Sequence, residues 1–256
     1  MKAVFAALSL LALASCGGGD ETRDERVSAC EAMIFEDTPL THCLADPAAH
    51  TIRTALAGPD GQVLASVGAL AAARGEDAAR VAFAVNGGMY DNEGRPIGYY
   101  VENGERLQRL NRNPGPGNFH LLPNGVFFGS DEEWAVLTSD EFAETIEERP
   151  SFATQSGPML LIDGEMHPEL SDNGPSRKIR NAVGVDGRGR AHFVISEVPL
   201  SMGRLARFYR DVLDVENALF LDGTVSQLWD PAKERIDTSI AIGPLIVVEK
   251  RARARP

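Results

Sequence analysis

Tight-turn signals set between short apolar segments constrain the fold of this chain more than any other feature of its sequence. Four such signals occur, at Asn103-Gly104, Asn124-Gly125, Asp163-Gly164 and Asp186-Gly187-Arg188-Gly189. The glycine in each of them tolerates the positive φ angles that the short turns of β-hairpins require. Apolar and β-branched runs of ordinary strand length lie beside these turns. The sequence therefore predicts a series of antiparallel hairpins.

Other segments add further strands and a small number of helices. Helical spacing of apolar residues predicts helices in Ser201–Val215 and in the short acidic segment Ser139–Glu148, with another inside Gly68–Arg80. The arginines of the first of these helices are read as a solvated face, with a binding patch as the alternative. Expected strands are Thr51–Leu56, Val63–Val67, Val81–Val85, Phe119–Leu122, Val126–Phe128, Met159–Ile162, Ala182–Val185, Ala191–Ser196, Ala218–Leu221 and Ile240–Val248. The predicted class is α+β, a mixed and mostly antiparallel sheet core with a few covering helices.

Length and charge exclude several classes of protein. The 256 residues, of which 43% are hydrophobic and 24% charged, suffice for a large buried core, so a fibrous or disordered chain is excluded. Acidic residues outnumber basic ones by 37 to 25, which gives a net charge of −12. A chain this acidic lacks the basic surface that binds a nucleic acid backbone, and we expect no nucleic acid partner.

The N-terminus has the pattern of an exported lipoprotein. Lys2 precedes the apolar run Ala3–Ala14, which is too short to cross a bilayer and is typical of a secretory signal. The sequence Leu13-Ala14-Ser15-Cys16 resembles a bacterial lipobox, which implies acylation of Cys16 and anchoring to a membrane. The predicted organisation is a signal peptide at 1–15, a lipidated tether at 16–28, a folded domain at 29–249 and a basic tail at 250–256. Gly17 after the acylated position resembles the sorting pattern for the outer membrane, and we expect the domain on its periplasmic face.

Export also decides how the remaining cysteines are interpreted. Cys30 and Cys43 are thirteen residues apart, and disulfides persist in the cell envelope, so a disulfide between them is predicted. The alternative is a metal pair with His42 and His50, although the paired short spacings of a zinc site are absent. We expect neither a metal nor a cofactor.

Polar residues interrupt the apolar runs at four junctions, and strand ends of this kind often carry functional sites. The junctions are Asn86-Gly87-Gly88-Met89-Tyr90-Asp91, Gln155-Ser156-Gly157-Pro158, Ser176-Arg177-Lys178-Ile179-Arg180-Asn181 and Leu221-Asp222-Gly223-Thr224-Val225-Ser226. Taken in order, with the strand before each, they resemble the phosphodiester glycosidase family over about Ala82 to Val247. The resemblance implies a mixed α/β fold and hydrolysis of a sugar that is attached through its anomeric carbon to a phosphodiester.

The resemblance also implies which residues bind the substrate. The family pattern is matched at Asn86, Gly87, Ser156, Gly157, Arg180, Asn181, Asp222, Gly223 and Ser226. One departure concerns the last junction, where the family often has glycines at the positions of Thr224 and Val225. A β-branched pair stiffens that loop and would narrow a pocket. This departure keeps open a second reading, a glycan-binding lipoprotein of the cell envelope without catalytic activity.

The chemistry of the residues agrees with such a substrate. Arg177 and Arg180 are the candidate phosphate clamp, because a guanidinium group donates two parallel hydrogen bonds to phosphate oxygens. Asp222 is the candidate nucleophile or base, and Glu197 the candidate second carboxylate. His120 lies near no Gly-x-Ser-x-Gly elbow, so a Ser-His-Asp hydrolase is not favoured. The leading hypothesis is a hydrolase of glycosyl phosphodiesters in envelope or exported glycans, with a carbohydrate or sugar phosphate as substrate.

Overall fold

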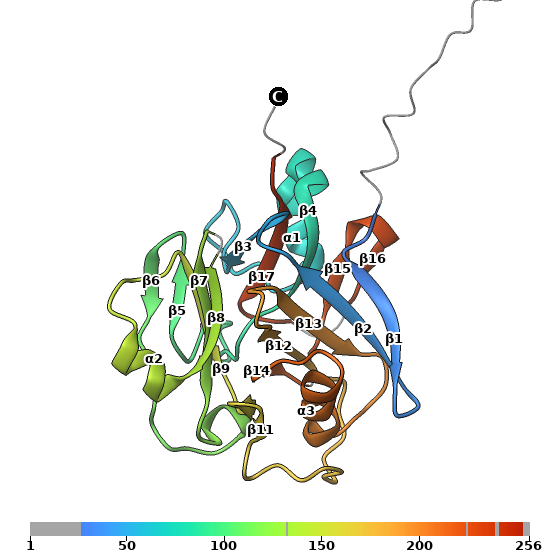
Figure 1. The fold of residues 1–256 in the computed structure, drawn as a ribbon. Helices are drawn as coiled ribbons and strands as arrows, with labels where there is room; N and C mark the ends of the chain where they lie inside the picture. Colours follow the sequence, from blue (N-terminus) through green and yellow to red (C-terminus); the bar gives the residue numbers. More distant parts are fainter. Residues whose placement is uncertain (1–26, 132, 224, 239–240, 253–256) are drawn as a thin grey trace, which may run out of the picture.

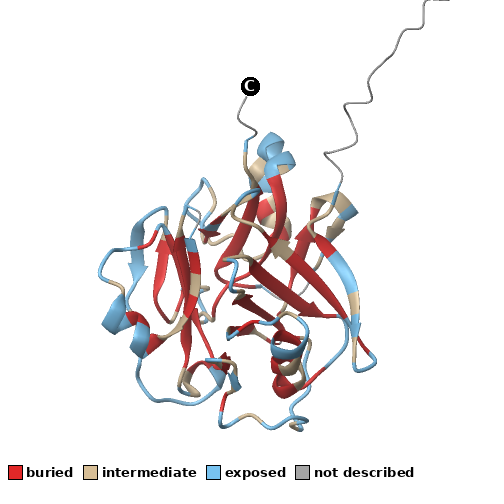
Figure 2. Ribbon diagram, viewed as in Figure 1, coloured by how far each residue is buried: buried red, intermediate tan, exposed pale blue. Residues whose placement is uncertain are grey.

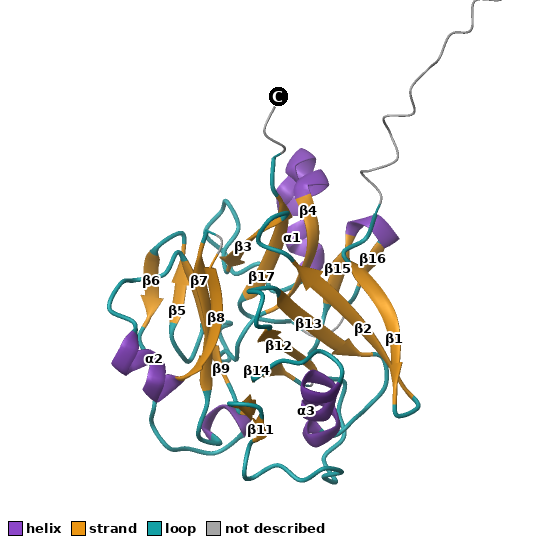
Figure 3. Ribbon diagram, in the orientation of Figure 1, coloured by secondary structure: helices purple, strands orange, loops and turns teal. Residues whose placement is uncertain are grey.

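Three antiparallel sheets pack around a shared core in a computed structural model of the chain, and the helices lie on the outside (Figure 1, Figure 3). The structure describes residues 27–131, 133–223, 225–238 and 241–252. The predicted signal peptide and Cys16 lie outside the described residues. Every strand pair in the three sheets is antiparallel, so the predicted α+β class with a mostly antiparallel core is confirmed.

The largest sheet has seven strands and is covered on one face by α3 (Met202–Asp211). Its strands, in spatial order, are β1 (Cys30–Phe35), β2 (Thr38–Ala45), β13 (Ala191–Ser196), β12 (Asn181–Val185), β14 (Asn217–Asp222), β10 (Met159–Ile162) and β11 (Glu165–Met166). The apolar face of α3, with Leu205 and Phe208, packs against Leu160 and Phe220 of the sheet. Tyr209 also donates a hydrogen bond of 2.6 Å to the carbonyl of Ala182.

Two sheets of five strands complete the fold. One has the order β16 (Arg235–Ile236), β15 (Leu228–Asp230), β4 (Val81–Asn86), β17 (Leu245–Lys250) and β3 (His50–Ala55). The other has the order β6 (Glu105–Gln108), β5 (Tyr100–Glu102), β9 (Phe152–Ser156), β7 (Gly125–Ser130) and β8 (Glu133–Thr138). The remaining helices are α1 (Val67–Arg74), α2 (Ser139–Thr145) and the 3-10 turns η1 (Gly75–Arg80), η2 (Asn118–His120) and η3 (Pro231–Lys233). None of the helices in the described part of the chain is long and apolar enough to span a membrane.

One aromatic cluster joins the three sheets at the centre of the molecule. Phe193 of the seven-stranded sheet lies 5.3 Å from the ring of Phe83 on β4 and 5.7 Å from the ring of Phe127 on β7. Both contacts are edge to face, a favourable geometry for aromatic rings. All three side chains are buried, and the strands around them are buried along most of their length (Figure 2). The sheets therefore share one core and hold their loops in fixed relative positions.

Three of the four turn signals join hairpins as predicted. Asn103-Gly104 connects β5 to β6, Asp163-Gly164 connects β10 to β11, and the turn at 186–189 connects β12 to β13. The prediction for Asn124-Gly125 was wrong, because the segment before it forms η2 instead of a strand. Asn124 Nδ2 donates to the carbonyl of Phe119, which holds that segment as a turn.

Other differences concern segments whose partners are distant in sequence. Val63–Val67 is not a strand, because Ser66 caps α1 through a 2.9 Å hydrogen bond from the amide of Ala69 to its hydroxyl. The last strand begins at Leu245, and the helix predicted over Ser139–Glu148 ends at Thr145. The strands β1 and β2 were not predicted; they have few β-branched runs, and β2 pairs with the distant strand β13 while β1 pairs with β2.

The predicted disulfide is confirmed. Cys30 and Cys43 are directly opposite each other in the β1–β2 register and are covalently joined. His42, which the alternative assigned to a metal, instead points Nε2 at Nδ1 of His192 on the neighbouring strand, at 3.0 Å. In the described ranges, no group of three or more His, Cys, Asp or Glu side chains is arranged to hold a metal ion.

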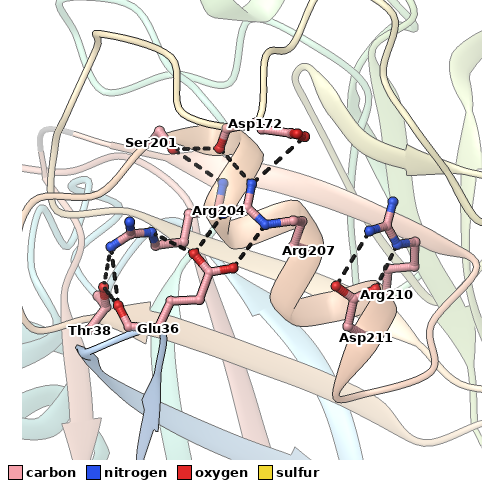
Figure 4. A network of polar contacts seen from close by, with 8 residues as sticks. All are labelled: Glu36, Thr38, Asp172, Ser201, Arg204, Arg207, Arg210 and Asp211. Atoms are coloured by element: carbon pink, nitrogen blue, oxygen red, sulfur yellow. Dashed lines mark hydrogen bonds and ion pairs between the residues drawn. The ribbon is translucent and has the colours of Figure 1, made fainter.

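The arginines of α3 are engaged in ion pairs (Figure 4). Arg207 donates from Nε and Nη2 to the two carboxylate oxygens of Glu36, at 3.0 and 2.7 Å, and from Nη1 to the carbonyl of Asp172. Arg204 donates to the hydroxyl of Thr38 at 2.8 Å. The hydrogen bond from Arg207 lowers the pKa of Glu36. These contacts fasten the helix to the β1–β2 turn, so this face of α3 is a structural contact.

Candidate functional site

The four polar junctions that the sequence analysis singled out meet in space. The amide of Gly88, after β4, donates to the hydroxyl of Thr154 on β9, at 2.9 Å. The hydroxyl of Ser156 donates to the carbonyl of Leu221 at 2.7 Å. The amide of Asp222 donates to Oδ1 of Asn181 at 3.0 Å, which links the ends of β14 and β12. Strand ends from all three sheets therefore build one site.

A pair of buried amides forms the centre of this arrangement. Asn86 and Asn181 are 1% and 2% exposed, and Asn181 Nδ2 donates to Asn86 Oδ1 at 3.0 Å. The oxygen atoms of the pair also accept the amides of Asp222 and Gln227, each at 3.0 Å. These two residues were predicted to bind substrate. The structure commits their amides to holding the 222–227 loop, so they are positioning residues.

A cavity of about 380 Å³ opens beside that loop. Its walls come from the loop after β4, from the segment around η2 and from the end of β14. The lining residues are Met89, Tyr90, Ile97, Pro116, Gly117, Asn118, Phe119, His120, Asp222 and Val225. Val225 occupies one of the positions where the family often has glycine, and its side chain is part of the wall. Thr224 lies outside the described residues.

Asp222 brings a carboxylate to the cavity wall. Its position at the end of β14 is fixed by its backbone, which bonds to Asn181 through the amide and accepts the hydroxyl of Ser226 at 3.3 Å. Tyr90 faces the same cavity and donates its hydroxyl to the carbonyl of Ala241 at 2.9 Å. Burial, together with the negative charge of Asp222, raises the pKa of Tyr90 to about 12. Tyr90 thus stays a neutral donor beside a carboxylate.

Arg180 is a buried cation directly behind the loop that carries Asp222. It is 1% exposed, and its guanidinium group lies 5.2 Å from the centre of the Phe220 ring. Nε donates to the carbonyl of Leu200, and Nη2 donates to the carbonyl and hydroxyl of Ser176. Burial lowers the pKa of Arg180 to about 10, so it keeps its charge at neutral pH.

No carboxylate of the described residues forms an ion pair with Arg180. Its Nη1 makes no hydrogen bond to a described residue and lies 3.4 Å from the position that a Cβ would take at Gly223. The same Cβ would approach the Phe220 ring to 3.1 Å. A glycine at 223 therefore lets the chain pass close to the guanidinium group. An unpaired buried charge costs folding free energy, so buried charges are normally paired with a group of opposite charge.

The other predicted glycines also mark close approaches. A Cβ on Gly157 would lie 2.7 Å from the Cβ of Asn124, and one on Gly87 would lie 3.3 Å from Pro244. The amide of Gly87 donates to the carbonyl of Pro244 at 2.7 Å. The structure thus gives these residues a packing role at the base of the site.

Among the predicted site residues that the structure describes, Asp222 alone is part of the cavity lining, and two of the others, Glu197 and Arg177, also have surroundings of a different kind. Glu197 accepts hydrogen bonds from Arg235 at 2.7 Å and from the hydroxyl of Thr41 at 2.6 Å, and it is not part of the cavity lining. Its intended partnership with Asp222 as a second catalytic carboxylate therefore has no support in the geometry. Arg177 is exposed on the segment before β12, whereas Arg180 is buried, and Arg177 is not part of the cavity lining, so the geometry does not support a clamp formed by the two.

The segment before β7 contributes more of the cavity wall than the sequence indicated. Pro116, Gly117 and Asn118, from the Gly- and Pro-rich run 113–118, line the cavity. Phe119 and His120, which follow that run directly, also lie in the wall. Aromatic residues next to a rigid loop could have indicated a cavity wall here, but the sequence analysis predicted a strand at Phe119–Leu122 instead.

Comparisons with known proteins place this geometry in context. A family model described as phosphodiester glycosidase matches residues 79–249. The chain is similar to the uncharacterized protein YigE of Escherichia coli (strain K12), with 39% identity over 150 residues. That alignment covers 59% of this chain and 58% of the relative, so the chain matches less than two thirds of the relative's length.

Several solved structures share the fold. The catalytic domain of zebrafish N-acetylglucosamine-1-phosphodiester alpha-N-acetylglucosaminidase, auto-inhibited by its pro-peptide, matches with a TM-score of 0.58 and 16% identity, over 87% of this chain and 82% of that one. A hypothetical protein from Synechocystis matches with a TM-score of 0.57 and 15% identity, over 87% and 61% of the two chains. A putative exported protein from Burkholderia pseudomallei K96243 matches with a TM-score of 0.53 and 11% identity, over 83% and 74%. At such identities, only the fold is shared.

Proposed function

Because the chain belongs to the phosphodiester glycosidase family, as its motifs predicted, we propose that it hydrolyses glycosyl phosphodiesters in cell-envelope or exported glycans. The bond cleaved joins the anomeric carbon of a sugar to a phosphate oxygen. The observation that carries the proposal is a buried arginine without a carboxylate partner among the described residues, placed directly behind a loop that presents a carboxylate to a cavity.

Both the phosphodiester and the sugar of such a substrate have a matching charged group at the site. A phosphodiester is anionic, and the charge of Arg180 is available to it, because Nη1 bonds to no described residue. The positive charge that develops on the sugar in the transition state is stabilised by the carboxylate of Asp222. In this proposal Asp222 also takes the proton of the attacking water. The cavity has the volume of an ordinary small-ligand site.

Turnover of defined substrates tests the proposal. The wild-type protein is incubated with a sugar linked through its anomeric carbon to a methyl phosphate diester, and release of reducing sugar is measured. We expect turnover by the wild type and a loss of about 10²-fold or more in Asp222→Asn, because amide cannot accept the proton. Asp163→Asn is the matched control, because Asp163 lies in the β10–β11 turn, outside the cavity lining.

A second substrate separates this activity from ordinary glycoside hydrolysis. Arg180→Met is expected to slow hydrolysis of the phosphodiester and to leave hydrolysis of an uncharged aryl glycoside of the same sugar nearly intact. Equal losses on both substrates would contradict a role for Arg180 in binding phosphate. Binding of the sugar phosphate without any turnover would instead favour a glycan-binding protein.

Export and lipid anchoring are part of the proposal and are carried by the sequence of residues 1–16. The disulfide between Cys30 and Cys43 suits an oxidising compartment of this kind. Cells that express the protein are labelled with a radioactive fatty acid, and the outer and inner membranes are separated. We expect label in the wild-type protein in the outer membrane fraction, and none in Cys16→Ala. An unlabelled wild-type protein would refute the anchor.

A further inference from the structure

His120 stands in the wall of the same cavity as Asp222, but it comes from a different part of the chain. It is the last residue of η2, whereas Asp222 is the last residue of β14. The ionisable side chains in the cavity lining are Tyr90, His120 and Asp222. Of these three, the imidazole is the group whose ring nitrogens can both donate and accept a proton. The cavity therefore holds a carboxylate and an acid–base group.

The hydrogen bonding of His120 fixes which ring nitrogen carries the proton. Nδ1 lies 2.7 Å from the backbone carbonyl of Asn113. A carbonyl oxygen only accepts, so Nδ1 is the donor and bears a hydrogen in the neutral ring. Nε2 makes no hydrogen bond to a described residue and is left to take up or release a proton. This arrangement is the one by which enzymes commonly prepare a histidine for proton transfer.

A glycine in the loop 113–118 leaves room beside Nε2 of His120. A Cβ on Gly115 would lie 2.9 Å from Cγ and Cδ2 of His120 and 3.1 Å from Nε2. These distances are too short for a side chain, so any other residue at 115 would push the ring aside. The φ angle of Gly115 is not positive, so the backbone itself would accept alanine. The ring position depends on this single missing side chain.

The loop that carries these groups is anchored at both ends. Gln155 accepts the amide of Asn111 at 3.0 Å and donates to its carbonyl at 2.6 Å. Asn124 Nδ2 donates to the carbonyl of Phe119 at 3.0 Å. The nearest cation in the loop, Arg112, is paired with Asp140 of α2 at 3.0 Å. The imidazole is thus held by a rigid frame and is not neutralised by a neighbouring carboxylate of its own loop.

We propose that His120 is a catalytic general acid that protonates the departing phosphate oxygen from Nε2. The inference rests on the proposed function. The water oxygen forms a bond to the anomeric carbon while the bond from that carbon to the phosphate oxygen breaks. The electron pair of the broken bond passes to the phosphate oxygen, which takes the Nε2 proton of the imidazolium form of His120 and leaves the neutral ring protonated at Nδ1. The proton of the attacking water passes to Asp222, and the products are the free sugar and a protonated phosphate monoester.

Two variants test the assignment against the wild type. His120→Gln removes the proton donor, and we expect turnover of the methyl phosphodiester substrate to fall about 10²-fold. Gly115→Ala retains the imidazole but displaces it, and a smaller loss in kcat is expected. His50→Gln is the matched control, because His50 begins β3 and is not in the cavity lining. Thermal unfolding of each variant reports whether the fold is retained.

The leaving group and pH give signatures that a structural role would not produce. With a phenyl phosphodiester, whose monoester product is the better leaving group, His120→Gln should lose less activity than with the methyl phosphodiester. The basic limb of the wild-type pH profile of kcat should also disappear in His120→Gln. Unchanged kcat, or equal losses on the two substrates with an unchanged pH profile, would overturn the assignment. If the wild type hydrolyses neither phosphodiester, the proposed function itself fails and this inference fails with it.

Discussion

Replacing Arg180 with methionine separates the stability of this protein from its capacity to bind an anion. Methionine is unbranched, flexible and uncharged, so it replaces the aliphatic part of the arginine side chain without a cation. Burial lowers the pKa of Arg180 from 12.5 to about 10, which at about 1.4 kcal/mol per pKa unit corresponds to roughly 3 kcal/mol of lost solvation. Folding of the wild type bears this cost, and the variant does not.

The hydrogen bonds of Arg180 act in the opposite direction. The guanidinium group donates three of them, to Leu200 and twice to Ser176, and each contributes about 1.5 kcal/mol because the donor is charged. The carbonyl of Leu200 keeps a second donor in the variant, the amide of Lys178, and Ser176 is exposed to water. The two effects nearly cancel. We therefore expect Arg180→Met to change the free energy of unfolding by no more than about 1.5 kcal/mol, in either direction.

Denaturant unfolding with and without inorganic phosphate measures both quantities. Phosphate should stabilise the wild type, by about 1.4 kcal/mol at ten times its dissociation constant, and should not stabilise Arg180→Met. Arg188→Met is the control, because Arg188 is exposed in the turn at the opposite end of β12. A loss of more than about 3 kcal/mol without phosphate, or equal stabilisation of both proteins by phosphate, would refute the reasoning.

The remaining predictions concern the frame of the site and the sequence-based assignments. Glu197→Gln should retain turnover within a few-fold, because Glu197 pairs with Arg235 outside the cavity lining; a kcat loss of 10³-fold would restore its catalytic role. Asn181→Ala should lower the free energy of unfolding by about 2–4 kcal/mol in urea, since it leaves buried donors unsatisfied. Cys43→Ser should cost about 3 kcal/mol in the same assay, and equal stability of the reduced and oxidised wild type would contradict this. Burial opposes ionisation of Asp186, yet hydrogen bonds from Arg190 outweigh burial and lower the pKa of the carboxyl to about 2. Roughly 2 kcal/mol of folding stability should therefore be present above about pH 4 and lost as the pH falls toward 2. Acid unfolding of Asp186→Asn should lack that dependence.

The chemistry-bearing corners could be located from the sequence because each is a local pattern. A polar cluster after an apolar run, as at Asn86 or Asp222, indicates a strand end whatever the rest of the chain does. The role of each residue could not be read in the same way. Asn86 and Asn181 are 95 residues apart, and their hydrogen bond exists only because the end of β4 meets the start of β12. Amides that were expected to hold a sugar therefore hold a loop.

The ion pairs could not be predicted from the sequence either. Glu197 follows β13 and Arg235 begins β16 in another sheet, so the two meet only through folding. Their ion pair removes Glu197 from the chemistry that its position after a strand suggested. His120 was set aside because no nucleophile stood near it in sequence, yet its neighbour across the cavity is Asp222. The strand β2 was missed for the same reason, since its partner β13 lies about 150 residues further on, and β1 in turn pairs with β2.

By itself, the sequence determined the hairpins, the antiparallel α+β class, the disulfide and the family, because turn chemistry, side-chain alternation and motif order act over short stretches of chain. Only the tertiary structure decided which polar groups bond to one another and which remain for a ligand. That division depends on close packing, because a buried polar group finds a partner only where the three sheets place one. Nη1 of Arg180 and Nε2 of His120 are among the atoms that make no hydrogen bond to a described residue.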